Sequence, residues 1–291
     1  MKAVILRWIP ACGKSSVANI YADSGYVVIS KDTLRAENPE HTEKEIGALQ
    51  EILILEAKDK EQDIVIDNAH CKSWQAEALM IHLTSLWFTT SILDVFANLV
   101  EQYEWDSLRA VRECIFRNMS RSKRVPQSVI WKMYFQLGYN LWDGSLAIFD
   151  LDWTLYDISE RLSEARREDW SIDWDIAFKD ELIKKDKIQS QVKKATALYD
   201  KVIIVSWRSN TCEEATLAKL ASDDVRFDAI LMRDSWDRRP DERVKGDLHS
   251  ILDKAGVKID CVYDDRKSVI DMWKSKGIYV FNCCQKSDND F

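Results

Sequence analysis

Short runs of apolar, mostly β-branched residues alternate with longer amphipathic stretches along the whole chain, and this alternation limits the fold more than any other feature. In the N-terminal half the apolar runs span residues 3–6, 26–29, 64–66 and 89–93. Helix-length stretches fall at residues 14–21, 42–58, 73–83, 108–118 and 126–136. Strands that alternate with helices pair in parallel, because each helix returns the chain to the same end of the sheet. The pattern predicts an α/β fold with a parallel sheet.

A second series of the same kind follows a pause at residues 140–145, where Asp143-Gly144-Ser145 has the composition of a turn. The apolar runs of this series span residues 146–149, 201–205, 229–231, 261–263 and 278–281. A chain of 291 residues is long enough for two domains that each bury a core. We therefore predict two parallel-sheet domains, at residues 1–143 and 144–291.

Composition excludes several classes of protein. Hydrophobic residues make up 46% and charged residues 31% of the chain, as in soluble globular proteins rather than fibres. No apolar run approaches a membrane span, and the N-terminal run is too short for a signal peptide. The seven cysteines lack C-x-x-C spacing, which indicates reduced thiols and a cytoplasmic protein. The net charge of −8 argues against a protein that coats nucleic acid, but not against one that contacts strand ends.

The first motif follows the first apolar run. Residues 8–15 read W-I-P-A-C-G-K-S and fit the phosphate-binding loop G-x-x-x-x-G-K-[ST] except at the first glycine, where Trp8 stands. In such a loop the helix N-terminus cradles phosphates, the lysine reaches the β- and γ-phosphates, and the serine holds Mg²⁺. We expect Gly13, Lys14, Ser15 and Ser16 to bind ATP, although a Gly-Lys-Ser triplet at a helix start also occurs without this role.

Charged residues follow the next two apolar runs. Asp32 and Arg35 come after the second run, and Asp67 closes the third. Ligands of α/β proteins bind at the carboxyl ends of parallel strands. Asp32 is therefore a candidate general base and Asp67 a second carboxylate near the metal. The alternative is that Asp32 caps the next helix and Asp67 is a turn residue.

Residues 147–155 read A-I-F-D-L-D-W-T-L and form the most specific pattern in the chain. Two carboxylates one residue apart after a buried strand allow Asp150 to attack phosphorus while Asp152 supplies a proton to the leaving oxygen. Three later features suit the same chemistry at the same sheet edge: Ser206 at a strand end, Lys245 opening a helix, and Asp264-Asp265 at another strand end. Paired acids can be plain helix caps, but four such elements in order favour a site of phosphoryl transfer.

With these motifs the chain resembles the bacteriophage-type bifunctional polynucleotide kinase/phosphatases, over nearly its whole length and in the same domain order. The resemblance implies a P-loop kinase domain followed by a Rossmann-like phosphatase domain of the haloacid dehalogenase type. It also implies two activities on DNA or RNA ends: ATP-dependent phosphorylation of 5′-hydroxyls, and Mg²⁺-dependent removal of 3′-phosphates through an aspartyl-phosphate.

For the kinase half, the resemblance implies that Lys14 and Ser15 bind ATP and Mg²⁺, that Asp32 is the base for the 5′-hydroxyl, and that Arg35 clamps the acceptor's 3′-phosphate. The stretch R-N-x-x-R at residues 117–121, followed by Val-Pro at 125–126, looks like the family's arginine-bearing lid. Arg121 would then stabilise the γ-phosphate. Residues 107–134 hold seven basic residues against one acidic residue, and the alternative is that they form a solvated helical face.

For the phosphatase half, the resemblance makes Asp150 the nucleophile and Asp152 the acid/base, with Ser206 and Arg208 as the second motif and Lys245 as the third. The implied Mg²⁺ site involves Asp150, the backbone carbonyl of Asp152, Asp264 and Asp265.

The segment at residues 233–245 reads R-D-S-W-D-R-R-P-D-E-R-V-K and looks like the family's R-x-x-x-D-x-R-x-D-x-x-x-K. It would place Arg233 and Arg239 at the substrate. It also distinguishes this family from phosphatases of small metabolites.

The departures from the resembled pattern share one form, because tryptophan stands where glycine is expected. This holds for Trp8, Trp153, Trp207 and Trp236, and also for Trp87 between a helix and a strand. The chain has 8 glycines and 12 tryptophans, so glycine is about 2.7% of the residues against an ordinary level of about 7%. One hypothesis is that the source genome reads UGA as glycine, so that many of these tryptophans are glycine in the natural protein. A tryptophan of the family is matched by Trp273, which should be genuine.

Two other functions stay open at this point. If the tryptophans are real, the chain is a degenerate relative that binds nucleic-acid ends without turnover. A kinase/phosphatase of a small metabolite is the other alternative. The sequence also leaves open whether DNA or RNA is preferred, whether a ligase acts downstream, and whether the chain forms a homo-oligomer.

Overall fold

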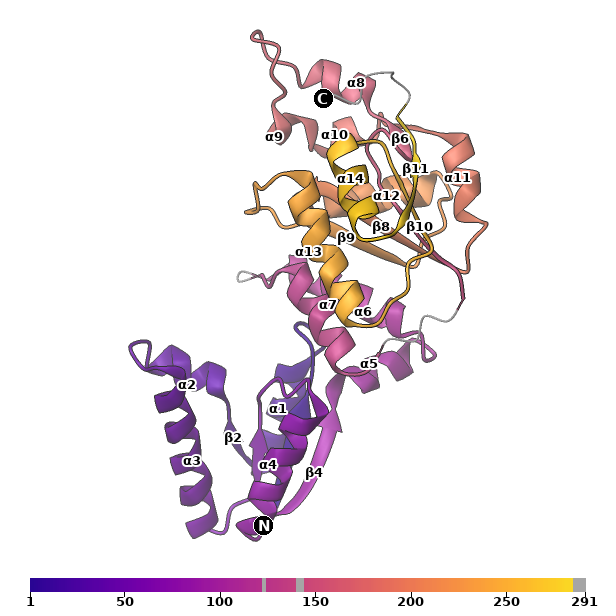
Figure 1. The fold of residues 1–291 in the computed structure, drawn as a ribbon. Coiled ribbons are helices and arrows are strands. Elements are labelled where there is room, and N and C mark those ends of the chain that lie inside the picture. The colour runs from indigo at the N-terminus through magenta and orange to yellow at the C-terminus, as the bar shows by residue number, and fades with distance from the viewer. Residues whose placement is uncertain (122–123, 140–143, 285–291) are drawn as a thin grey trace. The chain divides into compact units, whose positions relative to one another are not determined.

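The structure is a computed structural model that describes residues 1–121, 124–139 and 144–284 (Figure 1). The chain forms two compact units, one of Met1–Val125 with Val129–Tyr139 and one of Pro126–Ser128 with Asn140–Phe291. The predicted boundary after Asp143 lies outside the described residues, as does Lys123 of the basic segment. Within the described ranges, no helix is both long enough and apolar enough to cross a lipid bilayer.

The N-terminal unit is built on a four-stranded parallel sheet in the order β2-β3-β1-β4. In this sheet Val4 pairs with Val65 on one side and with Ser91 on the other. The central strands consist of buried, mostly β-branched residues, as expected of strands covered on both faces. The strands are β1 (Lys2–Arg7), β2 (Val27–Ile29), β3 (Ile64–Ile66) and β4 (Thr89–Asp94).

Helices connect these strands, and the predicted helix-length stretches are confirmed to within a few residues at their ends. The third helix shows why such a boundary can be read locally: the Thr42 hydroxyl accepts from the Glu45 amide while the Glu45 carboxylate accepts from the Thr42 amide. Two short helices, α2 and α5, were not predicted. The helices are α1 (Lys14–Asp23), α2 (Lys31–Glu37), α3 (Glu43–Asp59), α4 (Ser73–Ser85), α5 (Val95–Gln102), α6 (Ser107–Met119) and α7 (Gln127–Gln136).

The C-terminal unit is built on a five-stranded parallel sheet in the order β11-β10-β5-β8-β9, with β5 at its centre. Phe149 of β5 pairs with Tyr263 of β10 and with Ile204 of β8. The prediction of two parallel sheets is thereby confirmed. The strands are β5 (Leu146–Phe149), β8 (Lys201–Ser209), β9 (Ala229–Arg233), β10 (Cys261–Asp264) and β11 (Tyr279–Asn282).

Helices α11, α12, α13 and α14 connect the strands of this sheet, and α13 packs against α14 (Figure 1). A separate segment between β5 and α11 holds short helices and a two-stranded antiparallel sheet. The helices are α8 (Ser159–Glu164), α9 (Trp174–Ala177), α10 (Asp180–Ile183), α11 (Ser190–Thr196), α12 (Glu213–Ser222), α13 (Asp241–Lys254) and α14 (Lys267–Ser275); the small sheet pairs β6 (Tyr156–Asp157) with β7 (Lys187–Ile188).

Two local predictions were wrong, and the structure excludes one alternative. Ser206 lies inside β8, because this strand continues to Ser209 past a register shift between Ser206 and Ser209. Lys245 lies in the second turn of α13 rather than at its start. Asp32 does not cap the next helix: Ser30 is the N-cap of α2 and Asp32 lies in its first turn.

Candidate active sites

In the N-terminal unit, the connection between β1 and α1 turns at Gly13. Gly13 has a φ of 103°, in the left-handed region that glycine tolerates best, and it directly precedes α1. Glycine has no side chain to cap the helix, so no side chain competes with an anion at this N-terminus, although the Ser16 amide donates to the Gly13 carbonyl at 3.0 Å. Ser15 and Ser16 lie in this first turn and are exposed.

Lys14, the first residue of α1, lies between two carboxylates. Its Nζ is 3.4 Å from Oδ2 of Asp32 and 3.3 Å from Oδ2 of Asp67. Burial raises the pKa of Asp67, and the charge of Lys14 opposes that rise. The ammonium also lies 4.1 Å from the ring centroid of Trp8. The structure thus brings together three of the residues predicted for one site, with a tryptophan ring beside the lysine.

Arg35 extends this cluster on its exposed side. Its Nη1 lies 2.7 Å from Oδ1 of Asp32, and its Nε lies 2.7 Å from Oε1 of Glu43. All three side chains are substantially exposed, so these ion pairs add little to stability. They do orient the guanidinium, and a phosphate group would have to compete with Glu43 for it.

Arg121 is exposed and directly follows α6. Its segment is closed at the base by Asn118, whose amide Nδ2 donates to the Val125 carbonyl at 2.8 Å while its Oδ1 accepts from the Val125 amide at 3.0 Å. Among the contacts of the described residues, none brings Arg121 to Lys14. The structure therefore does not join the predicted lid arginine to the other kinase residues.

In the C-terminal unit, the acidic residues lie at the carboxyl ends of neighbouring strands. Asp150 follows β5, and its amide donates to the Tyr263 carbonyl of β10 at 3.0 Å. Asp264 ends β10 and Asp265 follows it. Parallel strands end at one edge of their sheet, so these side chains meet there.

Lys245 reaches this edge from α13 and is fully buried. Its Nζ lies 3.0 Å from Oδ1 of Asp150, 2.9 Å from Oδ2 of Asp264 and 3.5 Å from Oδ2 of Asp241. Burial acts to lower the pKa of Lys245, but the three carboxylates outweigh it and hold that pKa well above the ordinary value. Lys245 is therefore a permanent positive charge at the centre of the acidic cluster.

Asp150, Asp264 and Asp265 offer carboxylate oxygens that all lie within 4.8 Å of one another. Burial, with a contribution from neighbouring carboxylates, raises the pKa of Asp150 to about 7 and that of Asp265 to about 8. The Thr154 hydroxyl donates to Asp265 at 3.3 Å. Burial is the larger cause of both raised values, and the positive charge of Lys245 opposes the rise without cancelling it. Oxygen ligands with excess negative charge suit a hard divalent cation such as Mg²⁺.

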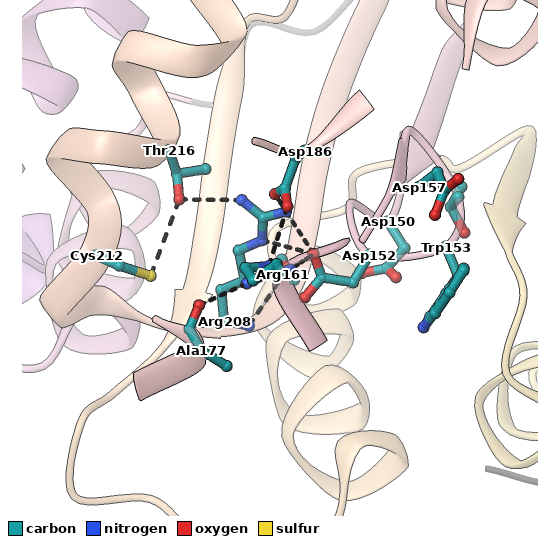
Figure 2. Close-up of polar contacts among 12 residues, drawn as sticks. Asp150, Asp152, Trp153, Asp157, Arg161, Ala177, Asp186, Arg208, Cys212 and Thr216 are labelled. Carbon is teal, nitrogen blue, oxygen red and sulfur yellow. Dashed lines mark hydrogen bonds and ion pairs between the residues drawn. The ribbon is translucent and has the colours of Figure 1, made fainter. Parts of the chain in front are cut away.

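Asp152 is turned into a different environment, a buried network with two arginines (Figure 2). Its Oδ1 lies 2.6 Å from Nη2 of Arg161 and 2.8 Å from Nε of Arg208. Asp186 closes the network at 3.0 Å from Arg161 Nε and 2.7 Å from Arg208 Nη2. Burial acts to raise the pKa of Asp152, but the guanidinium groups of Arg161 and Arg208 outweigh it and hold that pKa below its ordinary value.

The comparisons with known proteins settle the family. The family model of the polynucleotide kinase PNKP phosphatase domain matches residues 145–291, which is half of the chain. This chain belongs to that family. The PNKP phosphatase domain thus coincides with the part of the chain that holds the acidic cluster, Lys245 and the arginine network.

Similar solved structures include two complexes. A chain from the structure of the Pnkp1/Rnl/Hen1 RNA repair complex is 22% identical, and the match covers 97% of this chain and 95% of that chain with a TM-score of 0.39. A second structure of the Pnkp1/Rnl/Hen1 complex gives 21% identity, the same coverage and a TM-score of 0.39. A putative phosphatase from Clostridium difficile is 19% identical over 47% of this chain and 84% of its own, with a TM-score of 0.35. No curated protein matches the sequence significantly.

Three buried residues of the PNKP phosphatase domain were missed in the sequence. Arg161 and Asp186 belong to the network around Asp152, and Asp241 contacts Lys245 and also lies 3.6 Å from Nη1 of Arg266. Asp241 is part of the segment at 233–245, which was a sufficient signal to include it. Arg161 and Asp186 stand in no motif.

The arginines predicted to contact substrate are largely engaged within the protein. Arg233 is buried, and it donates to the backbone carbonyls of Trp207, at 2.8 Å, and of Asp237. Arg239 pairs with Asp237 at 2.8 Å and with Asp247 at 2.9 Å, and is about half exposed. Arg208 belongs to the buried network around Asp152. A role of these arginines at the substrate would therefore be exerted mainly through the residues that they position.

A pocket of about 40 Å³ opens onto the acidic cluster. Asp150, Asp152 and Ser206 are among its polar lining residues, and three tryptophans contribute to the rest of its wall. This volume holds only a few water molecules. The tryptophan side chains narrow the space beside Asp150 that a phosphorylated end would enter. The pocket lining is Asp150, Asp152, Trp153, Ile158, Trp174, Ser206, Trp207, Asp241, Asp265 and Arg266.

Proposed function

We propose that the chain heals nucleic-acid ends, with a 3′-phosphatase in its C-terminal unit and an ATP-dependent 5′-hydroxyl kinase in its N-terminal unit. The phosphatase half rests on one observation above all: Asp150, Asp265 and Lys245 converge, buried, at one sheet edge of a PNKP phosphatase domain. The kinase half rests on the cluster of Lys14, Asp32 and Asp67 beside an uncapped helix N-terminus.

The acidic cluster has the donor set for Mg²⁺. Asp150, Asp264 and Asp265 would hold the ion, together with the backbone carbonyl of Asp152. When bound, it supplies positive charge against the phosphate dianion, whose own charge repels an approaching carboxylate. Lys245 contributes a second positive charge from the protein, and its contact with Asp150 fixes the direction in which that carboxylate points.

In the proposed phosphatase reaction, a carboxylate oxygen of Asp150 attacks the phosphorus in line. The new bond to Asp150 forms as the bond to the nucleoside 3′-oxygen breaks, which leaves an aspartyl-phosphate and a 3′-hydroxyl end. A proton from Asp152 reaches the leaving oxygen. Asp152, then ionised, takes a proton from the water that hydrolyses the aspartyl-phosphate, so that phosphate is released and Asp152 is protonated again.

The arginines around Asp152 favour the second of these steps. Arg161 and Arg208 stabilise the ionised form of Asp152, which is the form that activates water. Proton donation in the first step requires the protonated form. We infer that the negative charge of the bound phosphorylated end raises the pKa of Asp152, so that Asp152 can be protonated for the first step.

In the proposed kinase reaction, the helix N-terminus and Lys14 hold the β- and γ-phosphates of ATP, with Gly13 and Ser16 at the loop. Ser15 would hold Mg²⁺, with Asp67 as a second oxygen donor beside it. The oxygen of the 5′-hydroxyl attacks the γ-phosphate, and ADP leaves. Asp32 accepts the proton that this hydroxyl loses. Arg35 contacts the acceptor's 3′-phosphate, and Arg121 stabilises the transferring phosphoryl group. The exposed Arg109 and Arg112 of α6 add positive charge for a nucleic-acid strand despite the net charge of −8.

The two reactions together leave a 5′-phosphate and a 3′-hydroxyl, the pair of ends that a nucleic-acid ligase joins. We therefore expect a ligase to act downstream on the product.

The decisive assay of the phosphatase uses an oligonucleotide with a 3′-phosphate and measures the release of inorganic phosphate. Asp150→Asn should abolish release, and Asp253→Asn, which removes an exposed carboxylate of α13 away from the acidic cluster, should not. Equal kcat/KM for the oligonucleotide and for a small sugar phosphate would favour the metabolite alternative. The assay is run on the chain with glycine at positions 153 and 207 as well as with tryptophan there.

The third candidate, a degenerate relative that binds ends without turnover, is favoured by one observation, the small tryptophan-lined pocket. It predicts tight binding of a 3′-phosphorylated end and no release of phosphate in both the tryptophan and the glycine forms. If the glycine form alone releases phosphate, the site is catalytic in that form and the candidate of a degenerate relative is rejected.

A further inference from the structure

The backbone places tryptophan in a conformation that this residue strongly disfavours. Among the residues that the structure describes, nine other than glycine have φ in the left-handed region, and four of them are tryptophan, although tryptophan accounts for 12 of the 291 residues of the chain. These are Trp87, Trp105, Trp153 and Trp170, with φ of 73°, 68°, 63° and 69°. A bulky side chain is rarely found there, because its Cβ approaches the neighbouring carbonyl oxygen, whereas glycine has no Cβ.

Trp87 occupies the position of a helix end that glycine normally fills. The Trp87 amide donates to the Thr84 carbonyl at 3.0 Å, and the Phe88 amide donates to the Leu83 carbonyl at 3.1 Å. This pair of hydrogen bonds is the Schellman motif, which requires a left-handed residue after the helix. The Trp87 side chain is 83% exposed and so has little packing to compensate the strain.

The same chain ends three other helices in the same way with glycine. Gly25, Gly256 and Gly277 follow α1, α13 and α14, with φ of 88°, 74° and 77°. Each repeats the hydrogen bond of Trp87 to the carbonyl three residues earlier, at 2.9 Å. Polar residues close three further helices, at Glu61, Glu104 and Asp224. A large aromatic residue at this position is the exception.

Trp170 and Trp105 show the same mismatch in other turns. In the hairpin around residue 169, the Trp170 amide donates to the Arg167 carbonyl and the Arg167 amide donates to the Ser171 carbonyl. The left-handed residue of such a three-residue loop is ordinarily glycine. Trp105 follows α5, where its amide donates to the Val100 carbonyl at 3.0 Å. The two indoles are 75% and 73% exposed.

At the candidate active sites the tryptophans occupy space that substrate needs. Trp153 and Trp207 line the pocket of about 40 Å³ beside Asp150. Trp8 puts its ring 4.1 Å from Lys14, on the ammonium that would meet ATP. Trp236 lies in the turn before α13 and is exposed.

Two other tryptophans have the opposite character. Trp131 and Trp273 are fully buried in helices, and Trp131 packs edge to face on Tyr134 with ring centroids 5.5 Å apart. Large apolar side chains at such positions stabilise a core. The chain thus contains tryptophans that the fold requires and tryptophans that its backbone disfavours.

We propose that the gene uses UGA as a glycine codon, and that the natural protein has glycine at the positions of Trp87, Trp105, Trp153 and Trp170. The positions of Trp8, Trp207 and Trp236, where the side chain obstructs a phosphate site or replaces a motif glycine, belong to the same set. Trp131 and Trp273 are encoded by UGG and are tryptophan. Glycine at positions 153 and 207 enlarges the pocket beside Asp150. Glycine at position 8 removes the ring that lies against the Lys14 ammonium.

The test is to read the codons and to measure peptide masses of the protein purified from its natural source. We expect TGA at the seven positions with glycine in the corresponding peptides, and TGG with tryptophan at 131 and 273. TGG at the seven positions overturns the proposal, and so does TGA that is decoded as tryptophan. Neither readout depends on enzymatic activity, so this proposal and the proposed function can fail separately.

A second measurement tests the backbone itself with a control in the same helix. Trp87→Gly should melt roughly 2–4 °C above Trp87→Ala, because alanine retains the strain of the left-handed conformation. Trp74 is an exposed residue inside α4, and there the order reverses, with Trp74→Gly below Trp74→Ala. Equal or lower melting temperature of Trp87→Gly relative to Trp87→Ala would contradict the conformational argument for position 87.

Discussion

Arg161 holds Asp152 from a position that solvent does not reach, with 2.6 Å between Nη2 and Oδ1. Arg161 also pairs with Asp186 and donates to the Ala177 carbonyl at 3.3 Å, so its guanidinium ties three segments to the carboxylate that we assign as acid/base. A lysine has a single ammonium and cannot span these partners.

We predict that Arg161→Lys lowers the kcat of the phosphatase by roughly tenfold or more and changes its pH profile. Loss of the guanidinium raises the pKa of Asp152, so the acidic limb of the water-activation step moves to higher pH. The measurement is kcat against pH on a 3′-phosphorylated oligonucleotide. A lower melting temperature with an unchanged pH profile would show that Arg161 has a structural role alone.

Asp150→Asn should remove 3′-phosphatase activity and leave 5′-kinase activity unchanged. The amide is a poor nucleophile and cannot form the aspartyl-phosphate, whereas the kinase residues belong to the other compact unit. Both activities are measured on one preparation with glycine at 8, 153 and 207, and Asp253→Asn serves as the matched carboxylate control. Phosphate release by Asp150→Asn at the parent rate would refute the covalent mechanism.

Lys14→Ala, Asp32→Ala and Arg121→Ala should each lower 5′-phosphorylation by about 10³-fold or more while the phosphatase survives. Each removes a charge or a base from the transfer of the γ-phosphoryl group, and loss of comparable arginines costs other phosphotransferases about 10³ to 10⁵ in rate. Transfer of labelled phosphate from ATP to a 5′-hydroxyl oligonucleotide is the measurement. Full activity of Asp32→Ala would exclude Asp32 as the base.

Binding of Mg²⁺ to the phosphatase site should weaken as the pH falls from about 8 to about 6. The pKa of Asp150 is raised to about 7 and that of Asp265 to about 8, so at the lower pH both carboxyls are mainly protonated. Mg²⁺ binds the ionised form and must displace those protons, which raises the apparent Kd by up to about tenfold per pH unit for each proton. Calorimetric titration of the Asp150→Asn variant should show a smaller pH dependence.

Chelation should silence both activities, because each proposed reaction uses a divalent cation. EDTA is added to the phosphatase and kinase assays, and activity is then restored with excess Mg²⁺. Phosphatase activity that persists in EDTA would exclude a metal at Asp150, Asp264 and Asp265.

The sheets and the main helices could be predicted because each element carries its own local signal. β5 is a run of four buried apolar residues that ends at a pair of aspartates, and α3 begins with its own capping box. The short elements between Tyr156 and Ile188 could not be predicted in the same way. Helices of four to six residues such as α8, α9 and α10 show no helical period, and they are stabilised by tertiary contacts instead.

Site residues that directly follow a strand could be predicted from the sequence. Site residues that become buried only by pairing with a residue distant in the sequence could not. Asp150 and Asp265 directly follow strands, so their meeting at the sheet edge follows from the parallel topology. Arg161 and Asp186 lie in separate short elements, and a charged residue in a sequence is exposed by default. Their burial depends on the pairing that folding creates.

Asn118 holds the two ends of the proposed lid segment together without any contact to ATP. By donating to and accepting from the same residue, Val125, its side chain closes the base of the segment that carries Arg121. The conformational entropy of bringing the two ends of that segment together is lost when the protein folds, before any substrate arrives. Less conformational entropy is then lost when ATP binds. The side-chain amide of Asn118, which bonds a residue seven positions away, would therefore affect how tightly Arg121 binds a phosphate.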